Sequence, residues 1–395
     1  MKDNRTAMDP EVDVVAKRKK RNAMRGVRRF SVFILLAIFC AYLYVQRDAW
    51  IPKLAGIGSR YQSITQNDGT LAEGNFPLTI SGKSDYQAEI ANDVLFIQND
   101  AYLYLYSPHG DLKDVRQHMF SNAVLKTSGA YALVYESDGS GFRVDKPSKN
   151  MFVKYLDNDI IFGVINDSGY TAIVTESDQY ACSLQVFDET GKAIYTRNCV
   201  NRLIDVTFQN DGNGCAFMEL DVENGELVSR MKSVRFDEKD VQWESEPLST
   251  MGLELSYSES GMLCVVGDTM CAYYDDSGNL SSSYTYMGDL VAYDVAYGSA
   301  AVILKDENQR EARLILMDRS ADSPSEVRIS DTSKKVLLSQ DDAYVMNADS
   351  ITSYAFSGKS IATVKLDVSY RTFVKQDGYI FLMGYDQINR VDFKE

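Results

Sequence analysis

Few side chains in this sequence are of the kinds that usually perform catalysis or hold metals. Among 395 residues there are only two histidines, His109 and His118, so imidazole-based acid–base pairs, metal sites and catalytic triads have little to draw on. His109 lies in a Pro-His-Gly turn and His118 on an expected outer strand, and we expect both at the surface. The sequence contains no GxSxG, HExxH, GxxxxGKS/T or DxDxDG pattern, which are marks of common nucleophile, zinc, phosphate and calcium sites.

Nucleotide binding has equally weak support. The segment Gly212-Asn-Gly214 is part of a dinucleotide-binding fingerprint, but it lies in an expected β turn without the helix that such a site needs. The sequence therefore predicts no catalytic residue, no metal ligand and no cofactor.

The cysteines offer a different chemistry, that of disulfide bonds. Cys264 and Cys271 flank a Gly-Asp turn signal; across a two-residue hairpin loop they would be directly opposed, at a Cα separation of about 5.5 Å that permits a disulfide. Cys182 and Cys199 flank another turn and come near register only with a bulge. The alternative is that these side chains are small buried apolar groups. No CxxC spacing occurs, which excludes zinc-ribbon and c-type haem sites.

Acidic residues recur in eight turns that the repeat described below would place on one face of the molecule. Taking one per turn, they are Asp100, Asp138, Asp178, Glu223, Asp268, Asp306, Asp349 and Asp386. A ring of carboxylates around a channel mouth would attract cations or a basic partner. The alternative is that Asp is an ordinary turn former in a chain that is acidic throughout. We keep the ring as a hypothesis for a partner-binding face.

The elements that must position these residues are β-strands. The chain is 45% hydrophobic and 25% charged, too apolar for a disordered protein. From residue 76 onward, short runs of Val, Ile, Tyr, Phe and Leu alternate with turn residues at a spacing typical of an all-β fold. No sustained helical period occurs in this region.

A repeat is visible in the turns. One series marks the turn between the first and second strand of each unit: Asn92-Asp93, Ser128-Gly129, Asp167-Ser168-Gly169, Asp211-Gly212, Ser260-Gly261, Gly298-Ser299, Asp341-Asp342 and Asp377-Gly378. Its steps of about 36 to 48 residues match a four-stranded propeller blade. A second series, between third and fourth strands, has seven members: His109-Gly110, Pro147-Ser148, Thr190-Gly191, Glu238-Lys239, Ser277-Gly278, Ala321-Asp322 and Gly358.

The unequal series predict how the ring closes. The eighth unit contains three strands before the chain ends, and an unused strand at residues 76–81 could supply the fourth by pairing with residues 387–393. Such pairing removes an exposed sheet edge. We therefore predict a β-propeller of eight four-stranded blades, with seven as the alternative if the irregular unit at residues 201–248 is a decorated loop.

The N-terminal part differs from this body. Residues 1–29 contain ten basic and four acidic residues, whereas the remainder contains 31 basic and 52 acidic residues. The apolar run at residues 30–46 is short for a membrane span, but Arg28, Arg29 and Arg47 can extend outward from its ends. We predict an uncleaved single-pass signal anchor with the basic arm in the cytoplasm, a polar tether at residues 47–75 and an exported domain at residues 76–395. The alternatives are a cleaved signal peptide, which lacks a small-residue cleavage site here, and a buried core helix.

A resemblance follows from these segments. The basic arm, the single span, the tether and a repeat unit such as GAYALVYESDGSGFRV at residues 129–144 resemble an uncharacterised domain-of-unknown-function family of membrane-anchored β-propellers from Gram-positive, mainly clostridial, bacteria. The resemblance covers most of the chain, but its motifs build blades and carry no chemistry. It implies a fold and a cell-envelope location, and no functional residue follows from it.

Two classes of function remain. The first is a non-catalytic scaffold or sensor, tethered to the membrane, that binds an envelope protein, a peptide or a glycan. The second is an envelope polysaccharide lyase or hydrolase, which would need carboxylates that converge in the propeller channel. The position of the basic arm against a membrane span is explained by topology and anionic lipid, so we predict no nucleic-acid partner.

Overall fold

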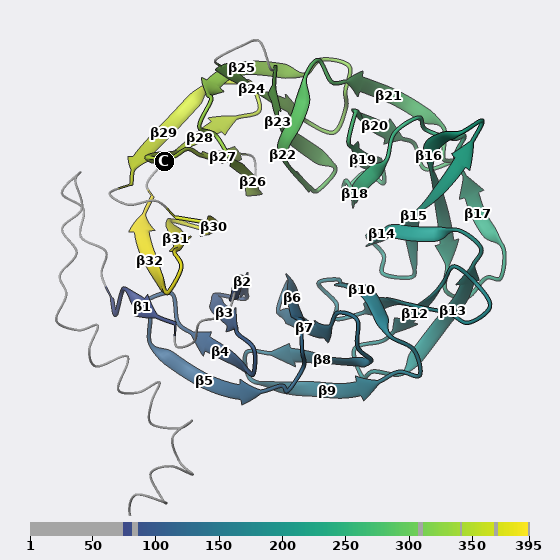
Figure 1. The fold of residues 1–395 in the computed structure, drawn as a ribbon, viewed down its shortest axis with the longest axis horizontal. Helices are drawn as coiled ribbons and strands as arrows, with labels where there is room; N and C mark the ends of the chain where they lie inside the picture. The colour runs from purple at the N-terminus through teal and green to yellow at the C-terminus, as the bar shows by residue number, and fades with distance from the viewer. Residues whose placement is uncertain (1–73, 81–85, 307–310, 340–341, 367–369, 394–395) are drawn as a thin grey trace, which may run out of the picture. The chain divides into compact units, whose positions relative to one another are not determined.

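The computed structural model describes residues 74–80, 86–306, 311–339, 342–366 and 370–393. These residues form eight antiparallel sheets of four strands, arranged as the blades of a propeller around a central channel (Figure 1). The predicted arm and span lie outside the described residues. Within the described residues, none of the helices is long and apolar enough to cross a membrane.

Blades 1 to 4 follow one another along the chain, each numbered from the channel outward. Blade 1 consists of β2 (Gln87–Ala91), β3 (Val94–Gln98), β4 (Tyr102–Tyr106) and β5 (Leu112–Gln117). Blade 2 consists of β6 (Ala123–Ser128), β7 (Tyr131–Glu136), β8 (Gly141–Lys146) and β9 (Lys149–Tyr155). Blade 3 consists of β10 (Ile160–Ile165), β11 (Thr171–Thr175), β12 (Cys182–Phe187) and β13 (Ala193–Cys199). Blade 4 consists of β14 (Arg202–Phe208), β15 (Gly214–Glu223), β16 (Glu226–Arg235) and β17 (Val241–Glu244).

Blades 5 to 8 complete the ring. Blade 5 consists of β18 (Gly252–Tyr257), β19 (Leu263–Gly267), β20 (Met270–Tyr274) and β21 (Leu280–Thr285). Blade 6 consists of β22 (Asp289–Ala296), β23 (Ser299–Lys305), β24 (Glu311–Met317) and β25 (Ser325–Ser330). Blade 7 consists of β26 (Lys335–Ser339), β27 (Asp342–Met346), β28 (Ser350–Ala355) and β29 (Ser360–Lys365). Blade 8 consists of β30 (Thr372–Gln376), β31 (Tyr379–Met383), β32 (Gln387–Asp392) and β1 (Leu78–Thr79).

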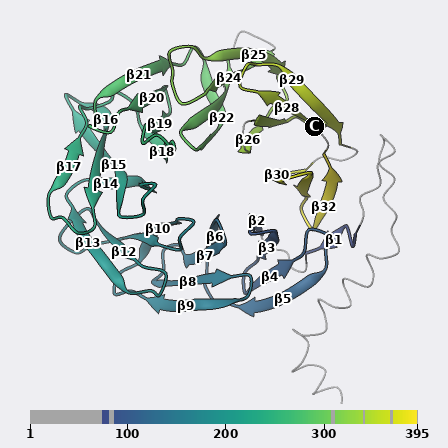
Figure 2. The same cartoon turned by 180° about the vertical axis from the view of Figure 1, so that it is seen from behind.

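The ring closes as predicted, through the first strand of the chain. Leu78 pairs with Ile388 and Thr79 with Gln387, so β1 lies beside β32 in both views (Figures 1 and 2). The Tyr86 hydroxyl then donates a hydrogen bond to the Gly384 carbonyl at 2.9 Å. The prediction of eight blades is confirmed, and the unit at residues 201–248 is a complete blade with a long β15–β16 hairpin.

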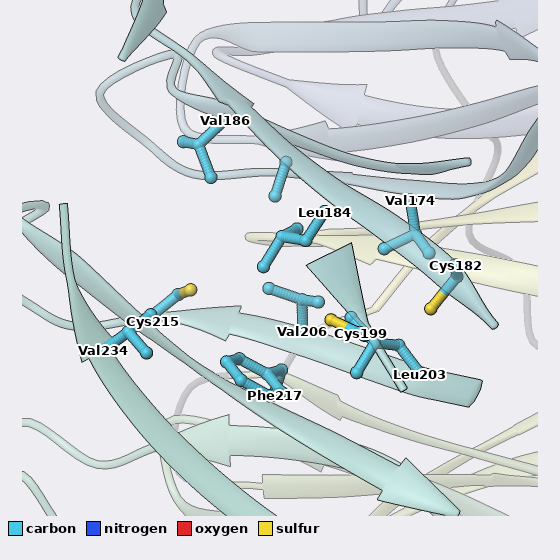
Figure 3. Packing of buried hydrophobic residues seen from close by; sticks show 11 residues of the cluster. Val174, Cys182, Leu184, Val186, Cys199, Leu203, Val206, Cys215, Phe217 and Val234 are labelled. Carbon is cyan, nitrogen blue, oxygen red and sulfur yellow. The ribbon is translucent and has the colours of Figure 1, made fainter. Parts of the chain in front are cut away.

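The second strand of each blade is apolar on both sides because neighbouring blades cover both. On β23, Ala300 and Val302 pack with Cys264 of blade 5, whereas Ala301 and Ile303 pack toward blade 7. A strand covered on both faces has a continuous apolar sequence instead of an alternating one. Figure 3 shows one such interface, in which Leu184 of blade 3 faces the cluster formed by blade 4.

A buried ion cluster also joins two blades. The Asp145 side chain of β8 is fully buried and lies 2.6 Å from Arg143 Nε and 3.0 Å from Arg116 Nη1 of blade 1. Arg116 further donates to the Lys146 and Pro147 carbonyls. The cluster therefore fixes the third strand of blade 2 to the fourth strand of blade 1.

The up-and-down order of the strands gives the propeller two different faces. Turns between strands 1 and 2 and between strands 3 and 4 lie on one face, here called the hairpin face. Turns between strands 2 and 3, together with the connections from one blade to the next, lie on the other, here called the crossover face. The chain joins β1 from the hairpin face, where the Asn75 amide donates to the His109 carbonyl at 2.7 Å.

Candidate functional site

A cavity of about 1240 Å³ extends from the crossover face into the central channel. Its mouth is formed by Asp268, Thr269 and Tyr286 at the crossover ends of blades 5 and 6. Deeper in the channel its wall consists of side chains from the first strands, including Glu89, Lys126, Glu254, Asp294 and Lys335. The cavity lining therefore combines charges of both signs with apolar side chains such as Leu253 and Leu337.

Bulges in the first strands help to position these acids. The register shifts between Leu203 and Asp205 on β14 and between Gly252 and Glu254 on β18, so each acid directly follows a bulge. A bulge bends the strand and redirects the next side chain. Asp205 and Glu254 thereby occupy equivalent positions on neighbouring inner strands.

Two carboxylates of the inner strands, Asp205 and Asp294, fasten one blade to the next. Asp205 Oδ2 accepts a hydrogen bond from the Leu255 amide at 2.7 Å, and Asp294 Oδ2 accepts one from the Leu338 amide at 2.5 Å. Both bonds run from the inner strand of one blade to that of the following blade. These two aspartates therefore have a structural role, since each joins the inner strands of two neighbouring blades.

The other two carboxylates, Glu89 and Glu254, form no hydrogen bond or ion pair within the described part of the chain. Lys126 and Lys335 likewise form no ion pair with the described residues, although both favour ionisation of the acids from a distance. The channel thus contains charged groups that the fold does not use for pairing. They are available to a ligand.

The channel shifts the protonation of its acids. Burial raises the pKa of Glu254 to about 8, and the nearby Asp205 and Asp294 carboxylates contribute to the increase. Burial raises the pKa of Asp205 to about 6, and it also raises the pKa values of Glu89 and Asp294. Glu254 can therefore carry a proton at neutral pH while a neighbouring aspartate is ionised.

The arrangement does not resemble a metal centre. Within the described residues, no group of three or more His, Cys, Asp or Glu side chains is placed to hold an ion. The inner-strand acids Glu89, Glu254 and Asp294 of the wall instead come from blades 1, 5 and 6. Such spacing suits an extended ligand with one or more positive groups better than a single cation.

The eight predicted turn acids all lie at the crossover face. Six are exposed, and Glu223 and Asp306 are half-buried. Asp268 has a structural contact, since its carboxylate accepts hydrogen bonds from Thr250 Oγ1 and the Met251 amide. Acidity alone does not distinguish this face, because exposed acids also occupy the hairpin face at Asp93, Asp167, Asp211, Glu238, Glu259, Asp276 and Asp377.

Exposed apolar side chains do distinguish the two faces. Of fourteen exposed large apolar residues in the described part of the chain, nine lie at the crossover face or within two residues of its turns, and three, Leu280, Tyr297 and Ile361, lie equally near the hairpin face. The nine, here called the apolar rim, are Met119, Tyr155, Tyr180, Val200, Val222, Leu227, Met251, Met287 and Tyr385. The crossover face therefore offers more apolar contact area to a partner than the hairpin face does.

One histidine is not where the sequence predicts it. His109 is exposed in its turn, as expected. His118 is only 6% exposed; its ring packs against Phe120, and its Nε2 lies 2.9 Å from the Asn99 carbonyl. Burial lowers the pKa of His118, which leaves it a structural, neutral group.

The cysteine register also differs from expectation. Cys264 pairs with Tyr273 and Cys271 with Val266, because the two-residue turn between β19 and β20 lies at Asp268 and Thr269, one residue later than expected. The two cysteines are therefore diagonal neighbours, which lie about 7–8 Å apart, instead of being directly opposed. Cys271 Sγ lies 3.1 Å from the Tyr286 hydroxyl, and all five cysteines in the described residues are free thiols.

The channel acids were not found from the sequence, although a signal exists. Asp205 and Asp294 are single acids inside the otherwise largely apolar runs LIDVTF and VAYDVA, and Glu254 lies in GLELSY. A lone acid within a strand of a propeller indicates an inner strand that faces the channel. The bulges that direct Asp205 and Glu254 leave no comparable mark in the sequence.

Comparison with solved structures identifies the fold. The chain is similar to Sqt1 from Saccharomyces cerevisiae, with 11% identity, a TM-score of 0.56 and coverage of 79% of this chain and 100% of that one. It is also similar to BamB from Moraxella catarrhalis, with 9% identity, a TM-score of 0.54 and coverage of 80% and 98%. At such identities the similarity shows the propeller fold alone. No curated protein matches the sequence.

A family model matches almost the whole described domain. The model covers residues 73–393, and its description is "Family of unknown function (DUF5711)". The match begins just before β1 and ends just after β32, so it coincides with the closed ring.

Proposed function

The chain belongs to the DUF5711 family of unknown function, and we propose from its geometry that it is a non-catalytic binding scaffold or sensor. It engages an envelope partner through the crossover face. The observation that carries this proposal is that the cavity mouth and the apolar rim occupy the same face. The rim supplies apolar contact area. The cavity supplies unpaired carboxylates at its centre, where a protein partner can insert a basic side chain.

The proposed location follows from the sequence and agrees with the way the chain joins the ring. We propose a single-pass anchor at residues 30–46, with the domain outside the cytoplasm. Residues 74–77 join β1 at the hairpin face. A tether that reaches the hairpin face leaves the crossover face free for a partner.

Acidic turns add long-range attraction to the proposed interface. Asp100, Asp178 and Asp386 are exposed, and their side chains make no hydrogen bond or ion pair with other described residues. Because the hairpin face is also acidic, these residues should mainly increase the rate at which a basic partner meets the propeller. They should contribute little to the choice of the crossover face over the hairpin face. Their contribution should decrease as salt shortens the Debye length.

The proposal is tested by cross-linking and affinity capture from native envelopes, followed by mass spectrometry. Replacing Val200 and Met287 by Ser should reduce capture of the main partner at least about tenfold, since burying one such side chain contributes roughly 1.5–3 kcal/mol. Replacing Leu280 and Tyr297 by Ser, on the hairpin face, is the matched control and should leave capture unchanged. Equal capture by both variants, with unchanged melting temperatures, would place the interface elsewhere.

A second variant tests the role of the channel in the same assay. Replacing Glu89 and Glu254 by Gln preserves their size and removes the carboxyls that would ionise beside a basic group of the partner. If a basic group of the partner enters the cavity, this variant should capture less partner than the wild type does. Its capture should also depend less on the salt concentration. Replacing Glu238 and Glu259 by Gln, both exposed on the hairpin face, controls for the loss of two charges.

One observation favours a second candidate, an envelope polysaccharide lyase or hydrolase. Glu254, with its pKa of about 8, could act as a general acid beside an ionised Asp205, which is the division of roles found in glycoside hydrolysis. Tyr286 and Tyr293 also line the cavity. Incubation with purified envelope polysaccharides should then release new chain ends, and Glu254→Gln should abolish the release. The absence of products from the wild-type protein would exclude this candidate for those polysaccharides.

A further inference from the structure

Cys182 and Cys199 form a pair whose geometry suits covalent linkage. Cys182 is the first residue of β12, Cys199 is the last residue of β13, and the two are directly paired across the strands. Directly opposed residues of antiparallel strands have Cα atoms about 4.5–5.5 Å apart, within the range of about 4.4–6.8 Å found in disulfides. Directly paired side chains also point to the same side of a sheet.

The surroundings of the pair place both thiols together. Both side chains lie in the cluster between blades 3 and 4, beside Leu203 and Val206 (Figure 3). Cys182 Sγ lies 3.6 Å from the Asn201 carbonyl, and Cys199 Sγ lies 3.9 Å from the Arg197 carbonyl. Among the described residues, neither thiol has an aromatic hydroxyl partner of the kind that Cys271 has in Tyr286.

The pair is also close to the crossover face. Cys182 follows the largely exposed turn at residues 176–181, and Cys199 precedes Val200, which is 74% exposed. Arg202 crosses this edge, with Nη1 3.1 Å from Glu176 Oε1 and 3.5 Å from the Ala181 carbonyl. A small opening of an exposed turn would therefore admit a reagent to Cys182.

One thiol of the pair is the better nucleophile. Hydrogen bonding from the Cys199 thiol, aided by the positive charge of Arg202, lowers the pKa of Cys182, whereas the pKa of Cys199 is raised. The thiolate is the reactive form of cysteine. Cys182 is thus suited to react first, and Cys199 to react second.

We propose that Cys182 and Cys199 are an oxidative modification site, and that they form a reversible disulfide when they meet an oxidant of the disulfide class. The Cys182 thiolate attacks one sulfur of the oxidant, forms a mixed disulfide and releases the other sulfur as a thiolate. The Cys199 thiolate then attacks Cys182 Sγ and releases the second thiolate. Overall, two protein thiols are oxidised and one oxidant disulfide is reduced to two thiols.

The linkage would change a specific part of the molecule. It would join the third and fourth strands of blade 3 at their crossover-face ends, next to Val200 of the apolar rim. The segment at residues 176–181 would then be held against the edge of the blade. This inference is independent of the proposed binding role, because it rests on the pairing of two thiols alone.

The test uses the full-length chain in buffers of oxidised and reduced glutathione over a range of ratios. Free thiols are blocked with iodoacetamide, and the chain is digested with trypsin. Lys192 and Arg197 lie between the two cysteines, so trypsin places them on separate peptides and the disulfide appears as a linked pair. We expect this pair to exceed any other cysteine pair at least about tenfold in the folded protein, and to disappear on return to reducing buffer.

Variants keep the result interpretable. Cys199→Ala should abolish the linked pair and leave a glutathione adduct at Cys182, whereas Cys264→Ala should leave the pair unchanged. If either variant fails to fold, the glutathione titration of the wild-type protein still shows whether the Cys182–Cys199 disulfide forms. The proposal is overturned if the pair forms only in denaturant, if it forms at no glutathione ratio, or if Cys264 and Cys271 link in equal yield.

Discussion

Acidic residues at single positions of the inner strands determine much of the chemistry of this protein. Asp205 and Asp294 accept backbone amides of the following blade, which keeps them in place. Glu254 has no such partner, and burial beside the two aspartates raises its pKa to about 8. Two classes of carboxylate therefore share one channel: those that hold blades together and those that remain available.

The raised pKa of Glu254 predicts a pH dependence of stability. In the unfolded chain this carboxyl ionises near its ordinary value of 4.5, and in the folded chain near 8. Its contribution to stability is therefore complete below about pH 4.5 and is lost as the pH rises through 8. Glu254→Gln should melt like the wild type near pH 5 and should be more stable by about 1–3 kcal/mol near pH 9, since one pKa unit corresponds to about 1.4 kcal/mol.

Thermal unfolding at pH 5, 7 and 9 checks this prediction. Glu259→Gln, an exposed substitution on the hairpin face, should follow the wild-type curve at every pH. A Glu254→Gln variant with the full wild-type pH dependence would show that this carboxyl ionises normally in the folded protein.

The buried Asp145 cluster makes a second residue-scale prediction. Asp145→Asn removes the charge that two buried guanidinium groups share, and loss of one member of a buried ion pair typically costs about 3–5 kcal/mol. Asp114→Asn is the matched control, because Asp114 pairs with the same Arg116 but is 46% exposed. Its cost should remain below about 1 kcal/mol. Chemical denaturation of the two variants distinguishes a buried clamp from an ordinary surface pair.

At the scale of elements, the turns were predictable and the channel wall was not. Turns that need positive φ favour glycine, and five of the described turns between first and second strands use it. Gly169, for example, adopts a φ of +86°, and a Cβ there would lie 2.4 Å from the Tyr131 ring of the preceding blade. Among the described residues, seven turns between first and second strands lie within one residue of their predicted positions, and the eighth falls at residues 340–341, outside the described part of the chain. The orientation of Glu254 depends on a bulge, and the register of Cys264 depends on which two residues form the turn. Neither is written in the residue types.

Closure of the ring by β1 predicts how N-terminal deletions affect the unfolding of the propeller. A protein that lacks residues 1–70 should retain a cooperative unfolding transition, because β1 is intact. Removal of residues 1–82 should expose the edge of β32 and the Phe381 cluster, and should cause aggregation or a broad transition. Calorimetry and light scattering compare the two proteins. Equal cooperativity would mean that two paired residues contribute nothing to closure.

At the scale of the whole molecule, the proposed topology has a direct test. A reporter fused after Glu395 that is active only outside the cytoplasm should be active. Protease added to intact protoplasts should degrade the propeller and spare residues 1–29. A protected C-terminus in intact protoplasts would contradict the single-pass arrangement that the basic arm and the apolar run predict.

The closure of the ring also has a mechanical consequence. Residues 1–75 connect to the propeller through β1, and β1 is held by the pairing of Leu78 and Thr79. If the N-terminal end of the protein were fixed and a partner pulled on the crossover face, the force would act on this short strand before it acted on any complete blade. The strand that closes the ring is thus also the element that should yield first under load, at forces that leave the other blades folded.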